Sequence, residues 1–288
     1  MLDYAATTNR DWTPMTQSKV TLTTLREMKA RKEPITWLTA YDYPTARLMD
    51  AAGIDMVLVG DSLGMTVLGF DTTLPVTMEH MVVFTAAVSR GAERTFVVGD
   101  MPFLSYQAEP AEAVRNAGRL MAEGGADAVK LEGGARMVGA ISAITDAGIP
   151  VLGHIGLTPQ SASQLGGYRA QGRTETAADE LARDARAIEE AGAVALLVEC
   201  VPPEAARRVL DSVDIPVLGL GSGVECDGQL LIVHDMLGLF DRFTPKFIKK
   251  YAEIGDAMKT AFENYGEEVK ARTFPTDEHA YTMSDPSS

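Results

Sequence analysis

The fold of this chain is decided by a stretch near its middle that reads Gly124-Gly-Ala-Asp-Ala-Val-Lys-Leu-Glu132. The glycines can take the left-handed conformation that ends a helix, and the small residues after them allow a tight turn into a strand. The strand that follows ends in two charged residues, Lys130 and Glu132, although parallel strands of this kind are usually apolar and buried on both faces. Isolated charges on a buried strand are costly, so this arrangement suggests a bound cation or a function.

The same pattern recurs along the chain. Similar helix-to-strand joints stand at Ala52-Gly-Ile-Asp-Met-Val, Ala147-Gly-Ile-Pro-Val-Leu and Ala191-Gly-Ala-Val-Ala-Leu. Other apolar runs close with Asp61, Asp100, His154 and Glu199. When parallel strands form a closed barrel, their carboxyl ends meet at one mouth, so we expect these polar side chains to lie together there.

Strands alternating with helices predict parallel βα units. We place helical segments at 44–52, 77–90, 110–123, 138–147 and 176–191, and strands at 35–40, 55–60, 94–99, 127–132, 149–154, 195–200, 215–220 and 230–233. This pattern predicts an α/β fold, a (βα)8 TIM barrel over residues 20–270. An extra N-terminal helix, Val20 to Arg31, is expected to plug the bottom of the barrel, and Pro245 to Tyr265 to add helix at the C-terminus. Residues 1–19 are expected to be irregular and 271–288 to form a mobile tail.

Composition narrows the class of partner. The chain has 288 residues, 46% of them hydrophobic, which suits one barrel domain of about 250 residues. A net charge of −14 argues against nucleic acid and anionic membranes and favours small-molecule substrates. The chain has only two cysteines, too few for a disulfide framework, and it shows no recognisable secretion signal and no apolar run of about 18 residues. These features predict a cytoplasmic protein.

The three carboxylates Asp61, Asp100 and Glu132 are candidate ligands for a metal ion. Hard oxygen ligands suit Mg²⁺, which takes one or two carboxylates and keeps positions for water and substrate. Such a site would accept a bidentate oxygen ligand such as a 2-oxo acid. The alternative for Asp61 and Asp100 is that each caps the helix that follows, and we assign that structural role to Asp42, which precedes a proline.

Lys130 and His154 each have several possible roles. Lys130 could neutralise Glu132, anchor a substrate carboxylate or form a Schiff base. His154 could contact the ligand or bond a loop carbonyl. The glycine-rich run Gly219-Leu-Gly-Ser-Gly223 lacks the spacing of a nucleotide-binding motif and reads as a tight turn.

A set of motifs gives the chain a specific resemblance to the ketopantoate hydroxymethyltransferase family, over residues of about 20 to 252. The motifs are Leu38-Thr-Ala-Tyr-Asp-Tyr-Pro44, Val59-Gly-Asp-Ser-Leu-Gly64, Thr73-Leu-Pro-Val-Thr77, Gly99-Asp-Met-Pro-Phe103, Val129-Lys-Leu-Glu-Gly-Gly134, Gly153-His-Ile-Gly-Leu-Thr-Pro-Gln160 and Cys226-Asp-Gly-Gln229. Members of that family are Mg²⁺-dependent barrels of the phosphoenolpyruvate/pyruvate superfamily. They act in pantothenate and coenzyme A biosynthesis.

The resemblance implies a reaction and roles for the residues. A hydroxymethyl group would pass from 5,10-methylenetetrahydrofolate, the co-substrate, to 3-methyl-2-oxobutanoate through a Mg-stabilised enolate, giving 2-dehydropantoate. Asp61 and Asp100 would bind the metal, with Glu132 as a further or water-mediated ligand, and Glu199 would be the catalytic base. Ser62 and Lys130 would contact the keto acid, with Asp61, Asp100 and His154 beside it. A homo-oligomer, often a decamer, is expected.

One position departs from the family pattern, and two other functions stay open. Ser222 stands where the family tends to have alanine, close to the mouth of the predicted barrel. One alternative is another metal-dependent lyase or mutase of the same superfamily, which would share the metal aspartates. The other is a non-catalytic barrel protein, against which the presence of Glu199, Lys130 and both aspartates argues.

Overall fold

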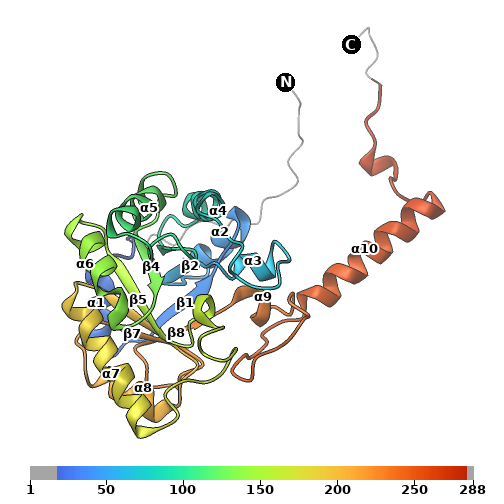
Figure 1. Cartoon of the computed structure of the whole chain (residues 1–288). Coiled ribbons are helices and arrows are strands. Elements are labelled where there is room, and N and C mark those ends of the chain that lie inside the picture. The colour runs from blue at the N-terminus through green and yellow to red at the C-terminus, as the bar shows by residue number, and fades with distance from the viewer. Residues whose placement is uncertain (1–17, 284–288) are drawn as a thin grey trace. The chain divides into compact units, whose positions relative to one another are not determined.

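The computed structural model describes residues 18–283, and the chain divides into two compact units, Met1–Val233 and His234–Ser288. In the first unit, eight parallel strands close into a barrel in the order of the sequence (Figure 1). The predicted (βα)8 barrel is therefore confirmed. The strands are β1 (Ile35–Thr39), β2 (Met56–Val59), β3 (Phe96–Asp100), β4 (Ala128–Glu132), β5 (Val151–Gly156), β6 (Ala195–Glu199), β7 (Val217–Leu220) and β8 (Gly228–Leu231).

Helices connect the strands and cover the outside of the barrel (Figure 1). They are α2 (Tyr43–Ala51), α3 (Leu63–Thr66), α4 (Met78–Gly91), α5 (Pro110–Ala122), α6 (Val138–Asp146), α7 (Glu175–Glu190) and α8 (Pro203–Leu210), with short 3₁₀ turns η1 (Ala135–Met137) and η2 (Pro159–Ser161). Their starts follow local signals: prolines lie in the first turns of α2 and α5, and Thr77 caps α4. The structural role assigned to Asp42 is also confirmed, because its side chain accepts from Thr45 N at 2.7 Å.

The predicted N-terminal helix is α1 (Leu22–Ala30), and its bonds place it at the bottom of the barrel. Lys29 Nζ donates to Ile215 O at 2.8 Å and to Asp227 Oδ2 at 2.9 Å. Ile215 and Asp227 precede β7 and β8, so both acceptors lie at the amino ends of strands. The helix thus covers the end of the barrel opposite the carboxyl ends of the strands.

Every predicted strand, and every predicted helix except the last, begins within two residues of its observed start. Strand β8 starts at Gly228, two residues before the predicted start. A side chain at Gly228 would meet Ile35 O at 2.3 Å, so this glycine lets β8 approach β1 and belongs to the strand. The C-terminal helix is α10 (Ile254–Ala271) rather than 245–265. The segment before it folds back on the short helix α9 (Val233–Met236), since Tyr251 N donates to Met236 O at 2.7 Å.

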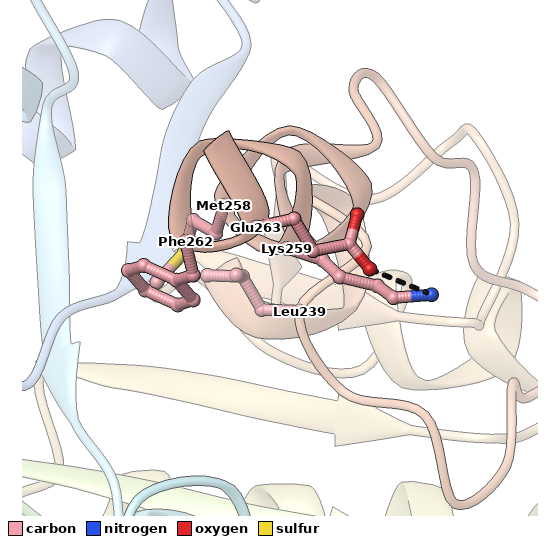
Figure 2. A pocket seen from close by; sticks show the side chains of 6 residues that line it. Leu239, Met258, Lys259, Phe262 and Glu263 are labelled. Carbon is pink, nitrogen blue, oxygen red and sulfur yellow. Dashed lines mark ion pairs between the residues drawn. The ribbon is translucent and has the colours of Figure 1, made fainter. Parts of the chain in front are cut away.

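The second unit contains α10, and the helix has no buried residue. Figure 2 shows a hollow beside it, where Leu239, Met258 and Phe262 lie close together and Lys259 pairs with Glu263 at 3.7 Å. Of the predicted tail, the part up to residue 283 includes the short turn η3 (Asp277–His279). The rest of the tail, and most of the segment predicted to be irregular at the N-terminus, lie outside the described residues. Within residues 18–283, no helix combines the length and the apolar character needed to cross a membrane.

Candidate active site

The polar residues predicted at the strand ends meet at one mouth of the barrel. The barrel register pairs Asp100 with Lys130 and Glu132 with His154, across β3, β4 and β5. Glu199 pairs with Gly156 at the end of β6. Each of the polar residues in this group is buried: Asp61, Asp100, Lys130, Glu132, His154 and Glu199. Neighbouring strands of a parallel barrel thus bring together residues that are far apart in the sequence.

Asp61, Asp100 and Lys130 form the centre of the group. Lys130 Nζ lies 2.7 Å from Asp100 Oδ1, and Asp100 Oδ2 accepts from the backbone N–H of Asp61 at 3.0 Å. Neither aspartate caps a helix: the residue before α3 is Ser62, and α5 begins well beyond Asp100. The helix-cap alternative does not hold for this structure.

Glu132, His154 and Glu199 form a second line of contacts. His154 Nδ1 is 3.5 Å from Glu132 Oε1, and His154 Nε2 is 3.2 Å from Glu199 Oε2. Burial lowers the pKa of His154, and the charge of Lys130, whose Nζ is 3.5 Å from His154 Nδ1, lowers it further. The imidazole is therefore neutral at pH 7 and can position Glu199 without adding positive charge.

The carboxylates of the group exceed its positive charge. Three of the four carboxylates, those of Asp61, Asp100 and Glu132, lie around one lysine, and these four side chains alone carry a formal excess of two negative charges at full ionisation. Burial raises the pKa of all three carboxyl groups, Asp61 most clearly because Asp100 and Glu132 repel its charged form, while Lys130 opposes the shift. Burial also lowers the pKa of Lys130, but the three carboxylates outweigh that effect and raise it, so the lysine stays charged.

This donor set fits a divalent cation such as Mg²⁺. Its ligands are hard oxygens, and its excess of two negative charges is what one such ion would neutralise. In residues 18–283, however, no three acidic, histidine or cysteine side chains converge on a single point as a complete metal site. Asp61, Asp100 and Glu132 are the residues that could hold such an ion, directly or through water.

Ser62 and Ser222 are held by different neighbours. Ser62 is half-buried beside Asp61, and its Oγ is 2.8 Å from the hydroxyl of Tyr41. Ser222 is fully buried and donates to Val198 O at 2.8 Å. The hydroxyl at this position therefore bonds the backbone next to Glu199, and no direct contact with a ligand is needed to explain it.

Sequence reasoning gave no role to Gln160, which contacts two of the carboxylates. Its side-chain Nε2 donates to Asp61 Oδ2 at 2.9 Å, and its backbone N–H donates to Glu132 Oε2 at 2.9 Å. Tyr106 was missed as well, although its hydroxyl lies 2.8 Å from Gln160 Oε1. Gln160 is the last residue of the motif that begins at Gly153. The one sequence signal for a role in the site was that this polar residue follows the strand containing His154.

Comparisons of the sequence with known proteins all point to the same family. A family model described as ketopantoate hydroxymethyltransferase matches residues 19–277. The 3-methyl-2-oxobutanoate hydroxymethyltransferase of Moorella thermoacetica is 56% identical over 92% of this chain and 98% of its own length. The protein of the same name from Syntrophus aciditrophicus is 54% identical over 91% of this chain and 97% of its own.

Solved structures share the fold at low sequence identity. A phosphonopyruvate hydrolase in complex with oxalate and Mg²⁺ superimposes with a TM-score of 0.59 at 14% identity, covering 91% of this chain and 92% of that chain. A 2,3-dimethylmalate lyase, a member of the PEP mutase/isocitrate lyase superfamily, gives a TM-score of 0.57 at 18% identity, covering 90% of this chain and 91% of that chain. At these identities the likeness extends to the barrel fold alone.

Proposed function

The chain belongs to the ketopantoate hydroxymethyltransferase family, and on that premise we propose that it makes 2-dehydropantoate from 3-methyl-2-oxobutanoate and 5,10-methylenetetrahydrofolate with Mg²⁺. It is a hydroxymethyltransferase enzyme of pantothenate biosynthesis. The observation that carries the finer proposal is the buried cluster of Asp61, Asp100, Lys130 and Glu132 beside Glu199 at one mouth of the barrel. The cluster offers oxygen ligands, a fixed positive charge and a base.

Asp61 and Asp100 would hold the Mg²⁺ ion directly, and Glu132 would hold it directly or through water. When bound, the ion supplies a Lewis acid that draws electron density from a 2-oxo acid and makes the proton at C3 more acidic. The position of Lys130, 2.7 Å from Asp100, supports its role as a fixed cation that favours negative charge on the substrate oxygens.

Glu199 would remove the proton from C3 of the keto acid. The electron pair left by that proton forms the new bond between C3 and the transferred carbon. Water supplies the hydroxyl oxygen, and tetrahydrofolate leaves as the second product. Neutral His154, 3.2 Å from Glu199, would keep the carboxylate in place. A carboxylate in this position is out of bulk water, which favours removal of a proton from carbon.

The test is to incubate the protein with the keto acid, 5,10-methylenetetrahydrofolate and Mg²⁺ and to measure 2-dehydropantoate. We expect Mg²⁺-dependent formation of the product that EDTA stops and added Mg²⁺ restores. Turnover of phosphonopyruvate- or dimethylmalate-type substrates, with no formation of 2-dehydropantoate in the assay, would assign the chain to another reaction of the barrel superfamily. No turnover of any of them would favour a non-catalytic role.

The family resemblance also leads us to propose a homo-oligomer, with a decamer as the expected form. Helix α10 supports this proposal, because it carries an exposed apolar row at the helical spacing of one face: Ile254, Met258, Phe262, Tyr265 and Val269. Figure 2 shows two of these side chains, Met258 and Phe262. Rows of this size usually bind a partner, and we propose a second copy of this chain. Light scattering on the wild type and on Phe262→Glu tests this, and an unchanged mass in the variant would remove α10 from the interface.

We propose a cytoplasmic location as well. Cys200 and Cys226 are both free thiols, which suits a reducing compartment. Fractionation of cells that produce the tagged protein would test the location.

A further inference from the structure

The hydrogen bonds of Gln160 connect loops at two sides of the mouth. The residue lies in η2, which begins three residues after the end of β5, and its side chain is buried. Its Nε2 donates to Asp61 Oδ2 at 2.9 Å and to Met101 O at 3.0 Å. Its Oε1 accepts from the hydroxyl of Tyr106 at 2.8 Å and from Gln107 Nε2 at 3.2 Å.

These partners allow the amide of Gln160 one orientation. A carboxylate oxygen and a backbone carbonyl are acceptors, so they must face the NH₂ group. The Nε2 of Gln107 can only donate, so it must face the oxygen. Rotating the amide by 180° would set acceptors against acceptors and break these bonds, which means that the assignment of nitrogen and oxygen follows from the chemistry.

The backbone of Gln160 serves the second carboxylate. Its N–H donates to Glu132 Oε2 at 2.9 Å, while its side chain holds Asp61. Tyr106 connects Glu132 with the side chain of Gln160, because its hydroxyl accepts a hydrogen bond from Glu132 N at 3.1 Å and donates one to Gln160 Oε1 at 2.8 Å. Asp61 in turn holds Asp100 through its own backbone N–H at 3.0 Å. One glutamine thereby fixes oxygens of two carboxylates that would otherwise repel each other.

We propose that Gln160 is a positioning residue of the active site, which holds Asp61 and Glu132 in the arrangement that receives the divalent cation. The proposal rests on the Mg²⁺-dependent function given above. Residues that orient metal ligands without touching the metal are worth about 10- to 100-fold in metal affinity when they are removed. Gln160 fits that class because it bonds two of the candidate ligands and nothing in its own contacts requires it to touch substrate.

The substitution Gln160→Met separates positioning from packing. Methionine keeps a similar length and volume but has no donor, so Asp61 loses its bond, whereas the backbone N–H continues to serve Glu132. The matched control is Gln164→Met, the same change four residues further on, at an exposed glutamine whose side chain accepts from Arg136 at 3.3 Å.

The readout is the dissociation constant of Mg²⁺ in the presence of 3-methyl-2-oxobutanoate, measured by isothermal titration calorimetry on the full chain. We expect binding that is about 10- to 100-fold weaker in Gln160→Met and unchanged in Gln164→Met. Turnover at saturating Mg²⁺ should fall by much less than turnover at limiting Mg²⁺, because a high concentration of the ion compensates for weak binding.

Gln160→Asn provides a second variant in case the methionine protein does not fold. Its amide is shorter by one methylene group and cannot reach Asp61, so Mg²⁺ binding should again weaken. A merely structural role would lower the melting temperature and leave the Mg²⁺ dissociation constant of both variants at the wild-type value, which would overturn the proposal. If the wild type itself binds no Mg²⁺ with the keto acid, the proposed function fails instead, so the two failures are distinguishable.

Discussion

Replacing Lys130 by methionine is the sharpest test of the charge balance at the barrel mouth. The lysine is buried, and its Nζ lies 2.7 Å from Asp100 Oδ1 and 3.9 Å from Glu132 Oε1. Removing one partner of a buried ion pair costs about 3–5 kcal/mol, because the remaining charge is left without compensation. Methionine retains most of the packing of the aliphatic stem, so the loss reports the charge.

The size of the loss should depend on pH. The pKa of Asp61, Asp100 and Glu132 is already raised by burial, and losing the lysine raises it further. A carboxyl group whose folded pKa is raised gives stability at low pH, and that stability is lost as the pH rises through the folded pKa. Without Mg²⁺, we therefore expect Lys130→Met to lose about 3 kcal/mol of unfolding free energy at pH 8 and clearly less at pH 5.

The assay is urea unfolding at both pH values, in EDTA and at one fixed protein concentration. Lys250→Met is the control, since it removes the same charge from an exposed pair with Glu253 at 3.2 Å, worth about 0.5 kcal/mol or less. A loss in Lys130→Met below about 1 kcal/mol at pH 8, or a loss that does not shrink toward pH 5, would refute the charge-balance argument.

Three further changes test other parts of the molecule. Glu199→Gln should still bind keto acid with Mg²⁺ but lose exchange of the C3 proton in D₂O, followed by NMR, because an amide cannot accept that proton; exchange at the wild-type rate would exclude Glu199 as the base. Burial raises the pKa of Asp235 to about 6, so its neutral form stabilises the fold at low pH and that stability is lost as the pH rises through about 6. Asp235→Asn should therefore raise the free energy of unfolding by about 1 kcal/mol at pH 8, a figure reduced for the partial exposure of Asp235, and have little effect at pH 4. Thermal unfolding at both pH values measures this, and an equal gain at pH 4 and pH 8 would contradict it. Asp50→Ala should cost about 3 kcal/mol in urea unfolding, because Asp50 Oδ1 accepts from Arg94 N and Thr95 N at 2.8 Å each and from Thr95 Oγ1 at 2.9 Å; a loss below about 1 kcal/mol would show that water replaces the carboxylate.

The strand ends could be predicted from the sequence because their signals are local. An apolar run that ends in Asp100 or Glu199 predicts a strand to within a few residues, and it also places the polar residue at the carboxyl end of that strand. Closure of the barrel then brings these ends together without further information. Strand β8 was placed two residues too late, although the missing side chain of Gly228 is what admits the strand beside Ile35.

The contacts of the loops could not be predicted in this way. Gln160 and Asp61 are 99 residues apart in the sequence, and their bond depends on how the turns after β2 and β5 meet above the barrel. Tyr106 reaches Gln160 across 54 residues from the loop after β3. Neither residue has a periodic pattern or a spacing that marks it, so both become visible only when the loops are in place.

The contrast between Asp50 and Asp61 shows which buried carboxylate points to function. Both are buried. Asp50 sits against backbone N–H groups and a hydroxyl, so the protein itself stabilises its charge, and its role is to join α2 to the start of β3. Asp61 receives one amide from Gln160, and its pKa is raised by burial and then by the neighbouring carboxylates Asp100 and Glu132. Burial alone is therefore a poor indicator, whereas a carboxylate that the protein leaves undercompensated among other carboxylates calls for a cation from outside the chain.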